Sequence, residues 1–144
     1  MAAKRLILDG GALAALGAGD PRACHWAYVA TLRGILLGIP APVLAETLDG
    51  GAGDAAIGAA IPSHDAVLPT TREIAEEAGA LRARSKRDDA TVDALVIATA
   101  LQHPGSLVLT TDPKELRLLA ALRPEAAIAI AIAGIEGGRK KQRR

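Results

Sequence analysis

The sequence predicts an α/β domain built on a parallel sheet whose two faces are covered by helices. Strand-like apolar runs alternate with helix-length segments along most of the chain, which is typical of a parallel sheet. The clearest of these runs are apolar at every position, as strands buried on both faces are. The length of 144 residues and the hydrophobic content of 50% indicate a single domain with one core.

The first half of the chain is predicted to form one strand and three helices. Leu6 to Leu8 are the first strand, and residues 12–16 start a short helix that a glycine-rich stretch ends. Further along, we expect a helix over 24–38 ended by glycine, a turn or short edge strand over 39–42, and a short helix over 43–48 closed by Gly50 and Gly51.

The second half alternates more regularly between helices and strands. After an irregular stretch and a short apolar segment at 66–69, residues 70–84 form a helix in which Thr70 and Glu73 have capping-box spacing. Residues 91–103 are apolar on nearly all sides and predict a deeply buried helix. We then expect a strand over 106–111, a helix over 113–123 with Pro113 at its first position, and a last strand over 127–133.

The charge is divided unevenly between the body of the chain and its end. The net charge is +1, but the terminal RKKQRR holds five of the 17 basic residues, so 12 basic residues face 16 acidic ones in the remainder. We therefore predict a mildly acidic domain over 1–136 and a basic, disordered tail over 137–144. Such a tail is either attracted to polyanions or to an acidic partner, or is simply a solvated end.

Composition also predicts where the protein works. The longest apolar stretch, residues 126–135, is about half of the ~20 residues that span a bilayer, and the chain does not begin with a secretory signal. We expect a cytoplasmic protein that does not bind membranes. Cys24 is the only cysteine, which excludes an internal disulfide and a cysteine zinc site.

Four acidic residues stand at the ends of predicted buried elements. Asp9 and Asp112 follow two strands, and ligands of parallel sheets bind beyond the carboxyl ends of strands. Asp93 lies in the first turn of the buried helix, and Glu46 lies among apolar neighbours in a short helix. Because acids gathered in this way repel one another, the set predicts a bound cation, and oxygen ligands favour Mg²⁺ or Mn²⁺.

Each acid also has a purely structural interpretation. Asp9, before two glycines, is typical of a turn. Asp112 and Glu115 have the spacing of a capping box, and Asp93 would interact favourably with the dipole of its helix. Glu46 fits the surface of a short helix.

Four segments of the chain resemble the successive acidic motifs of PIN-domain ribonucleases, most closely the VapC toxins of bacterial toxin–antitoxin operons. The segments occur in the family's order and span most of the chain: LILDGGAL, PVLAETLDGG, TVDALVIATAL and LVLTTDPKELRLLA. The resemblance implies a three-layer α/β/α sandwich with a central, mostly parallel sheet. It also implies that Asp9, Glu46, Asp93 and Asp112 are catalytic and hold one or two Mg²⁺ or Mn²⁺ ions, with Asp9, Asp93 and Asp112 as metal ligands.

Two further positions bear on this resemblance. Thr110 matches a hydroxyl residue that the family often carries two places before its last acid, and we expect it to support the site. At the position two residues after the first aspartate, the family usually has Ser or Thr, whereas this chain has Gly11. A haloacid-dehalogenase-type phosphohydrolase would need a second aspartate at that same position, so Gly11 argues against that class.

The function implied is a metal-dependent endoribonuclease that acts as the toxin of a toxin–antitoxin pair. A bound divalent ion lowers the pKa of its water and neutralises charge that develops on the phosphodiester. We expect Arg84, Lys86 and Arg87 to contact RNA phosphates, although a solvated loop would have the same composition. The resemblance further implies a cognate antitoxin and a homodimer. The alternative is a catalytically inactive PIN-like module that binds RNA or protein.

Overall fold

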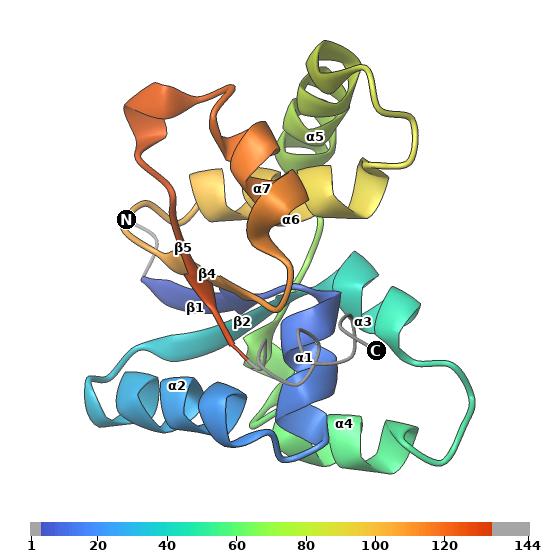
Figure 1. Cartoon of the computed structure of the whole chain (residues 1–144), viewed down its shortest axis with the longest axis vertical. Helices are drawn as coiled ribbons and strands as arrows, with labels where there is room; N and C mark the ends of the chain where they lie inside the picture. The colour runs from blue at the N-terminus through green and yellow to red at the C-terminus, as the bar shows by residue number, and fades with distance from the viewer. Residues whose placement is uncertain (1–3, 134–144) are drawn as a thin grey trace, which may run out of the picture.

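The protein is a five-stranded parallel sheet enclosed by seven helices, in a computed structural model that describes residues 4–133 (Figure 1). The predicted α/β/α fold class is confirmed. The strands are β1 (Arg5–Leu8), β2 (Leu36–Pro40), β3 (Val67–Leu68), β4 (Leu107–Thr110) and β5 (Ala129–Ile132). The helices are α1 (Gly10–Gly17), α2 (Pro21–Leu32), α3 (Ala41–Thr47), α4 (Asp54–Ala60), α5 (Arg72–Ser85), α6 (Thr91–Leu101) and α7 (Pro113–Ala120).

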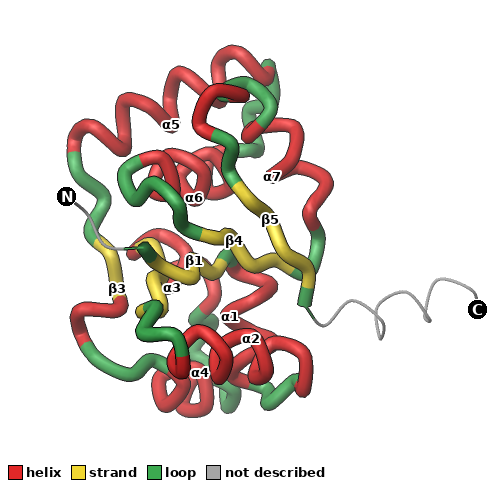
Figure 2. The backbone as a smooth tube through the Cα atoms, turned by 90° about the vertical axis from the view of Figure 1, so that its left-hand side faces the viewer, coloured by secondary structure: helices red, strands yellow, loops and turns green. Residues whose placement is uncertain are grey.

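The strand order is β3-β2-β1-β4-β5, so the chain reverses its direction of travel across the sheet between β3 and β4 (Figure 2). Register is continuous through the centre: Ile7 pairs with Gly38 on one side and with Val108 on the other. Helices α1, α2 and α4 cover one face of the sheet, and α5, α6 and α7 lie on the other (Figure 1).

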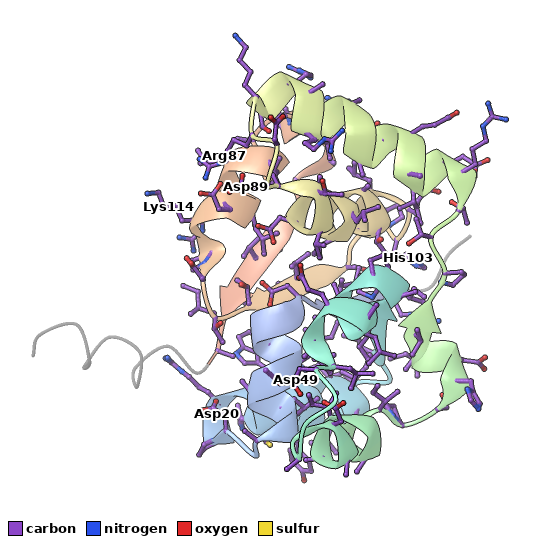
Figure 3. The ribbon with its side chains drawn as sticks, turned by 90° about the vertical axis from the view of Figure 1, so that its right-hand side faces the viewer. Asp20, Asp49, Arg87, Asp89, His103 and Lys114 are labelled. Atoms are coloured by element: carbon purple, nitrogen blue, oxygen red, sulfur yellow. The ribbon has the colours of Figure 1, made fainter. Side chains whose placement is uncertain are left out.

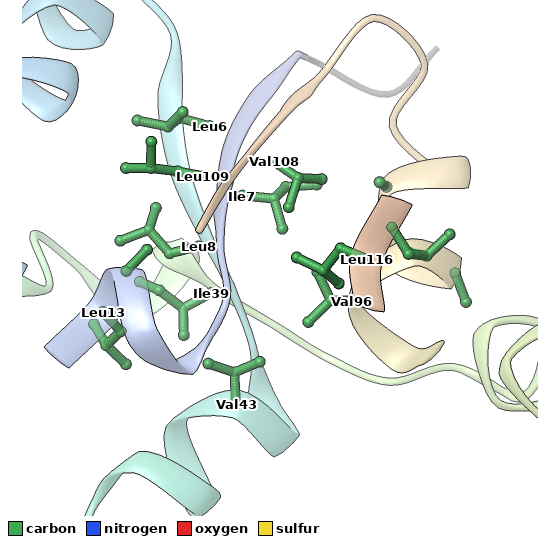
Figure 4. Packing of buried hydrophobic residues seen from close by; sticks show 14 of the residues in the cluster. Leu6, Ile7, Leu8, Leu13, Ile39, Val43, Val96, Val108, Leu109 and Leu116 are labelled. Atoms are coloured by element: carbon green, nitrogen blue, oxygen red, sulfur yellow. The ribbon is translucent and has the colours of Figure 1, made fainter. Parts of the chain in front are cut away.

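The core lies on both faces of the central strands (Figure 4). Ile7, Val108 and Leu109 are at most 1% exposed, because strands with helices on both sides bury every side chain. Ile7 and Val108 point toward Val96 and Leu116 on the α6–α7 side, whereas Leu109 lies on the opposite face (Figure 4); all five belong to the same buried cluster. Helix α6 is buried along most of its length, as its uniformly apolar sequence predicts.

The helix predicted over 24–38 is wrong in its second half. Helix α2 ends at Leu32, Gly34 takes a left-handed φ of +72°, and residues 36–40 form β2. Of the turn or edge strand predicted over 39–42, residues 39 and 40 instead end a strand that lies between β1 and β3, and residues 41 and 42 begin helix α3. Gly38 serves packing within this strand, since a Cβ there would lie 2.8 Å from Leu68 Cδ1.

Two smaller expectations also need correction. The stretch expected to be irregular contains helix α4. Helix α5 is capped by Thr71, whose side chain accepts a hydrogen bond from the Ile74 amide at 3.2 Å, so the capping box of Thr70 and Glu73 is absent.

The predicted basic tail over 137–144 lies outside the described residues. Within residues 4–133, no helix has the length and apolar character needed to cross a bilayer.

Candidate active site at the carboxyl ends of the strands

The topology places two of the predicted acids next to each other. Strands β1 and β4 are neighbours, although the first half of the chain extends the sheet on the β2 side and the second half on the β5 side. In an open parallel sheet, this switch point leaves a crevice outside the carboxyl ends of the two strands. Asp9 follows β1 directly and Asp112 follows β4 after one residue, so both stand at this switch point.

Asp9 is a buried N-cap residue. Its side chain is only 9% exposed, and Oδ1 accepts a hydrogen bond from the Ala12 amide at 2.9 Å. The capping bond explains why a helix starts at two glycines, which have a low helix propensity. Burial raises the pKa of the Asp9 carboxyl, while the bonds from Thr110 and Ala12 lower it and the charge on Asp112 raises it.

Thr110 connects the two acids that end β1 and β4. Its hydroxyl donates to Asp9 Oδ2 at 2.5 Å and accepts from the Asp112 amide at 3.0 Å. The side chain is fully buried, so a hydroxyl there requires partners, and it has one on each side. Thr110 thereby fixes the orientation of the Asp9 carboxylate.

Asp93 is the electrostatic centre of the acidic cluster. It lies half-buried in the first turn of α6, and no helix N-H bonds its side chain. Burial is the main cause that raises its pKa from 3.8 to about 6, followed by the charges of nearby acids: Asp9, Glu115, Glu46 and Asp112, in decreasing order. The structure therefore brings Asp9, Glu46 and Asp112 within electrostatic reach of Asp93.

No salt bridge neutralises these four acids within the described part of the chain. The ion pairs formed there involve other carboxylates. Glu46 and Asp112 are exposed on the rim, whereas Asp9 lies below it. Among residues 4–133, no three His, Cys, Asp or Glu side chains are arranged so that they could hold a metal ion as they stand. One reason is that both Asp9 oxygens already accept hydrogen bonds from protein groups.

The donor chemistry nevertheless fits a hard divalent cation. Asp9, Asp93 and Asp112 offer only oxygen, which Mg²⁺ and Mn²⁺ prefer. The repulsion that raises the pKa of Asp93 is the kind that a bound cation removes. Exposed Asp112 and half-buried Asp93 accept no short hydrogen bond from the described residues, so their side chains are free to rotate.

Glu115 is a fifth acid of this cluster, although its place in the sequence suggests only a capping residue. The capping box with Asp112 is absent, because the Asp112 amide donates to Thr110 instead. Glu115 Oε2 lies 2.9 Å from Nη2 of Arg87, and Oε1 is buried without a hydrogen-bond donor from the described residues. No sequence signal separates this role from a cap, because both place a glutamate in the first turn of a helix.

Gly11 stands where side-chain space is already occupied. A Cβ built on Gly11 would lie 2.2 Å from Oγ1 of Thr111, so the hydroxyl of Thr111 fills the position that a side chain at 11 would take. Although this chain lacks the usual Ser or Thr at position 11, a hydroxyl still lies at this place, and it belongs to Thr111.

The three basic residues predicted to contact RNA lie near the C-terminal end of α5, and Arg87 among them contacts the acid Glu115. Arg84 is exposed and donates to the Leu122 carbonyl at 3.4 Å, and exposed Lys86 is the left-handed C-cap of α5 with a φ of 60°. Arg87 forms the ion pair with Glu115 and lies near Asp89 (Figure 3). All three side chains are exposed. Their contact with RNA stays a prediction.

Comparison with known proteins agrees with this architecture. The model of the PIN domain family matches residues 6–122, a segment that contains all five acids described above. PIN domains are generally metal-dependent nucleases, which supports a hydrolase. A search of curated proteins finds no match.

Proposed function

Because the chain belongs to the PIN domain family, we propose that it is a Mg²⁺- or Mn²⁺-dependent endoribonuclease. The observation that carries the proposal is the gathering of Asp9, Glu46 and Asp112 around Asp93 without a basic partner from the described residues. A structural set of acids would be expected to pair with Lys or Arg, since unpaired like charges destabilise a fold.

In this proposal, the acids divide the work by their position. Asp9, Asp93 and Asp112 hold the cation, with Asp9 fixed by Thr110 and Ala12 and the other two free to adjust. Glu46, exposed on α3, faces the same cluster and accepts a proton or orients a water molecule. When bound, the cation supplies hydroxide near neutral pH and neutralises charge that develops on the phosphodiester.

The substrate that we propose is single-stranded RNA. Its phosphates would approach the acids past Arg84, Lys86 and Arg87, which place positive charge beside an acidic crevice. Phosphate contacts of this kind position the strand without reading its bases. Exposed Lys86 forms no ion pair with the described residues and is the freest of the three.

We propose that this enzyme is the toxin of a cytoplasmic toxin–antitoxin pair and forms a homodimer. A groove of about 590 Å³ on the α2–β2 side supports a protein partner, because its lining contains no charged residue. Tyr28 and Leu36 are 63% and 54% exposed at this groove, which is unusual for side chains of this size. An apolar segment of an antitoxin would cover them.

Two experiments test the proposal. Purified protein should cut single-stranded RNA with added Mg²⁺ or Mn²⁺ and not with EDTA. If it binds RNA but does not cut it under any metal condition, the alternative of an inactive binding module is correct. For the toxin role, co-expression with the neighbouring open reading frame should relieve growth inhibition; persistent toxicity would argue against an antitoxin encoded there.

A further inference from the structure

We infer that Glu115 is a fifth carboxylate of the acidic site and that Arg87 is its positioning residue, an inference that rests on the proposed function. Glu115 would accept a hydrogen bond from the hydration shell of a bound divalent cation. Arg87 would hold the glutamate in the orientation that makes this contact possible. Three features of the pair support these roles.

The first feature is that Glu115 does not form the capping bond that its position in its helix would allow. Its position at the third residue of α7 would suit a reciprocal cap, in which its carboxylate accepts from the amide of Asp112. That amide donates instead to Thr110 Oγ1 at 3.0 Å. The helix start is therefore complete without the Glu115 side chain, and its carboxylate is available for another purpose.

The second feature is the unequal environment of its two oxygens. Oε2 lies 2.9 Å from Arg87 Nη2, whereas Oε1 is shielded from solvent and accepts from no described residue. A buried carboxylate oxygen without a donor is costly, so the missing donor should come from whatever occupies the site. Mg²⁺ keeps several of its waters when it binds a protein, and these waters are donors.

The third feature is where Arg87 comes from. Arg87 (Figure 3) lies in the loop between α5 and α6, just before the turn of α6 that holds Asp93, while Glu115 lies on α7. The ion pair therefore ties the helix that contains Asp93 to the helix that follows Asp112. Outer groups of this kind orient metal ligands, and their loss typically lowers metal affinity about 10- to 100-fold.

The experiment is a titration of the full chain with Mn²⁺, followed by the rise in Tm, with no RNA present. Glu115→Gln should need about tenfold more Mn²⁺ than the parent for half of the maximal rise. The matched control is Glu77→Gln. Glu77 forms a 2.7 Å ion pair with Arg123 and is 27% exposed, against 28% for Glu115. Because it is not among the acids that act on Asp93, this control should keep the parent midpoint.

Arg87→Gln tests whether Arg87 acts on Mn²⁺ binding by orienting Glu115 or only through its positive charge. Removal of a cation near the acids should by electrostatics alone tighten Mn²⁺ binding, whereas a loss of positioning should weaken it. We expect a midpoint several-fold above that of the parent, restored most of the way in Arg87→Lys. The double variant Arg87→Gln/Glu115→Gln should bind no more weakly than Glu115→Gln alone, because Arg87 acts through Glu115.

The outcomes distinguish this inference from the proposed function. If the Tm of the parent rises with Mn²⁺, the rise is lost in Asp93→Asn, and Glu115→Gln retains the parent midpoint, the acidic site stands and the role of Glu115 is overturned. A midpoint for Arg87→Gln at or below that of the parent overturns the positioning role. If Mn²⁺ does not raise the Tm of the parent at all, both the metal site and this inference are wrong.

Discussion

The two ends of the sheet carry opposite charges and treat them differently. At the carboxyl ends, Asp9 and Asp112 act electrostatically on Asp93, and none of the three has a basic partner from the described residues. At the amino ends, Lys4, Arg5 and Arg33 surround a small pocket of about 140 Å³ that Trp26 also lines.

The difference lies in how the charges are satisfied. Nη1 of Arg5 donates to the Leu37 carbonyl at 2.9 Å and to the Asp65 carbonyl at 3.3 Å, so its charge helps to hold β1, β2 and the following turn together. Arg33 ends helix α2, where a cation is favourable. At the other end Asp9 caps α1, but the charge of Asp93 is opposed by the charges of the neighbouring acids. The comparison teaches that mutual repulsion among acids, and not charge as such, marks the candidate active site.

The largest expected effect is on activity. Asp93→Asn should abolish cation-dependent RNA cleavage while the fold is kept, because the side chain bonds no helix amide and Asn has the same shape. Cleavage of a labelled single-stranded RNA and circular dichroism measure the two properties. Arg33→Gln, at the opposite end of the sheet, is the control and should cleave at the parent rate. Full cleavage by Asp93→Asn would remove this aspartate from the site.

The next effect is on metal-dependent stability. With EDTA at neutral pH, Asp9→Asn should be at least about as stable as the parent, because burial of a charge next to Asp112 is removed and Asn still accepts from the Ala12 amide. Cation at 100 times its Kd should stabilise the parent by about 2.7 kcal/mol and the variant far less. Thermal melts with EDTA and with excess Mg²⁺ test this. Equal Mg²⁺ shifts in both proteins would leave Asp9 as a helix cap only.

The dependence of stability on pH should distinguish Asp93 from ordinary carboxylates. Its pKa is about 6 in the fold against an ordinary value of 3.8, so between these values the native state binds more protons than the unfolded state. The Asp93 contribution to stability therefore falls as pH rises from about 4 to about 6. Without metal, the Tm of the parent relative to Asp93→Asn should decrease over this range.

Excess Mg²⁺ should reverse that trend. A cation binds the charged carboxylate, so metal stabilisation should grow as pH rises through about 6. The same melts repeated with Mg²⁺ measure it. A relative Tm that does not change with pH in either condition would contradict the electrostatic account of Asp93.

These acids can be predicted from sequence because each one ends an element with a strong signal. The apolar runs of β1 and β4 and the apolar helix α6 fix where Asp9, Asp112 and Asp93 stand. The parallel sheet then brings the ends of β1 and β4 together. The approximate positions of these acids can therefore be predicted from the type and order of the secondary-structure elements alone.

The parts that sequence patterns do not predict depend on contacts between distant residues. For strand β2 the pattern favours the end of a helix, because Leu36 and Leu37 continue an apolar run and Gly38 resembles a helix stop. Its strand conformation is set by pairing with β1 and by close packing of Gly38 on Leu68. The role of Glu115 likewise depends on Arg87, 28 positions earlier in the sequence.

The smallest expected effect concerns the tight packing at the acidic end of the sheet. Gly11→Ser should destabilise the fold by about 1 kcal/mol, because its Cβ would lie 2.2 Å from Thr111 Oγ1 and the threonine would have to rotate or shift. Thr111→Ala removes that obstacle, so the double variant should regain most of the stability lost by Gly11→Ser, as measured by urea unfolding. Gly53→Ser is the control, since nothing lies within 4 Å of a Cβ at that glycine.

If Gly11→Ser and the double variant are equally destabilised, the cost arises from the helix start itself and not from Thr111. If the double variant also cleaves RNA at the parent rate, a hydroxyl carried by residue 11 is equivalent to one carried by Thr111. In that case the hydroxyl that the family usually carries at the position of Gly11 would be supplied in this chain by Thr111.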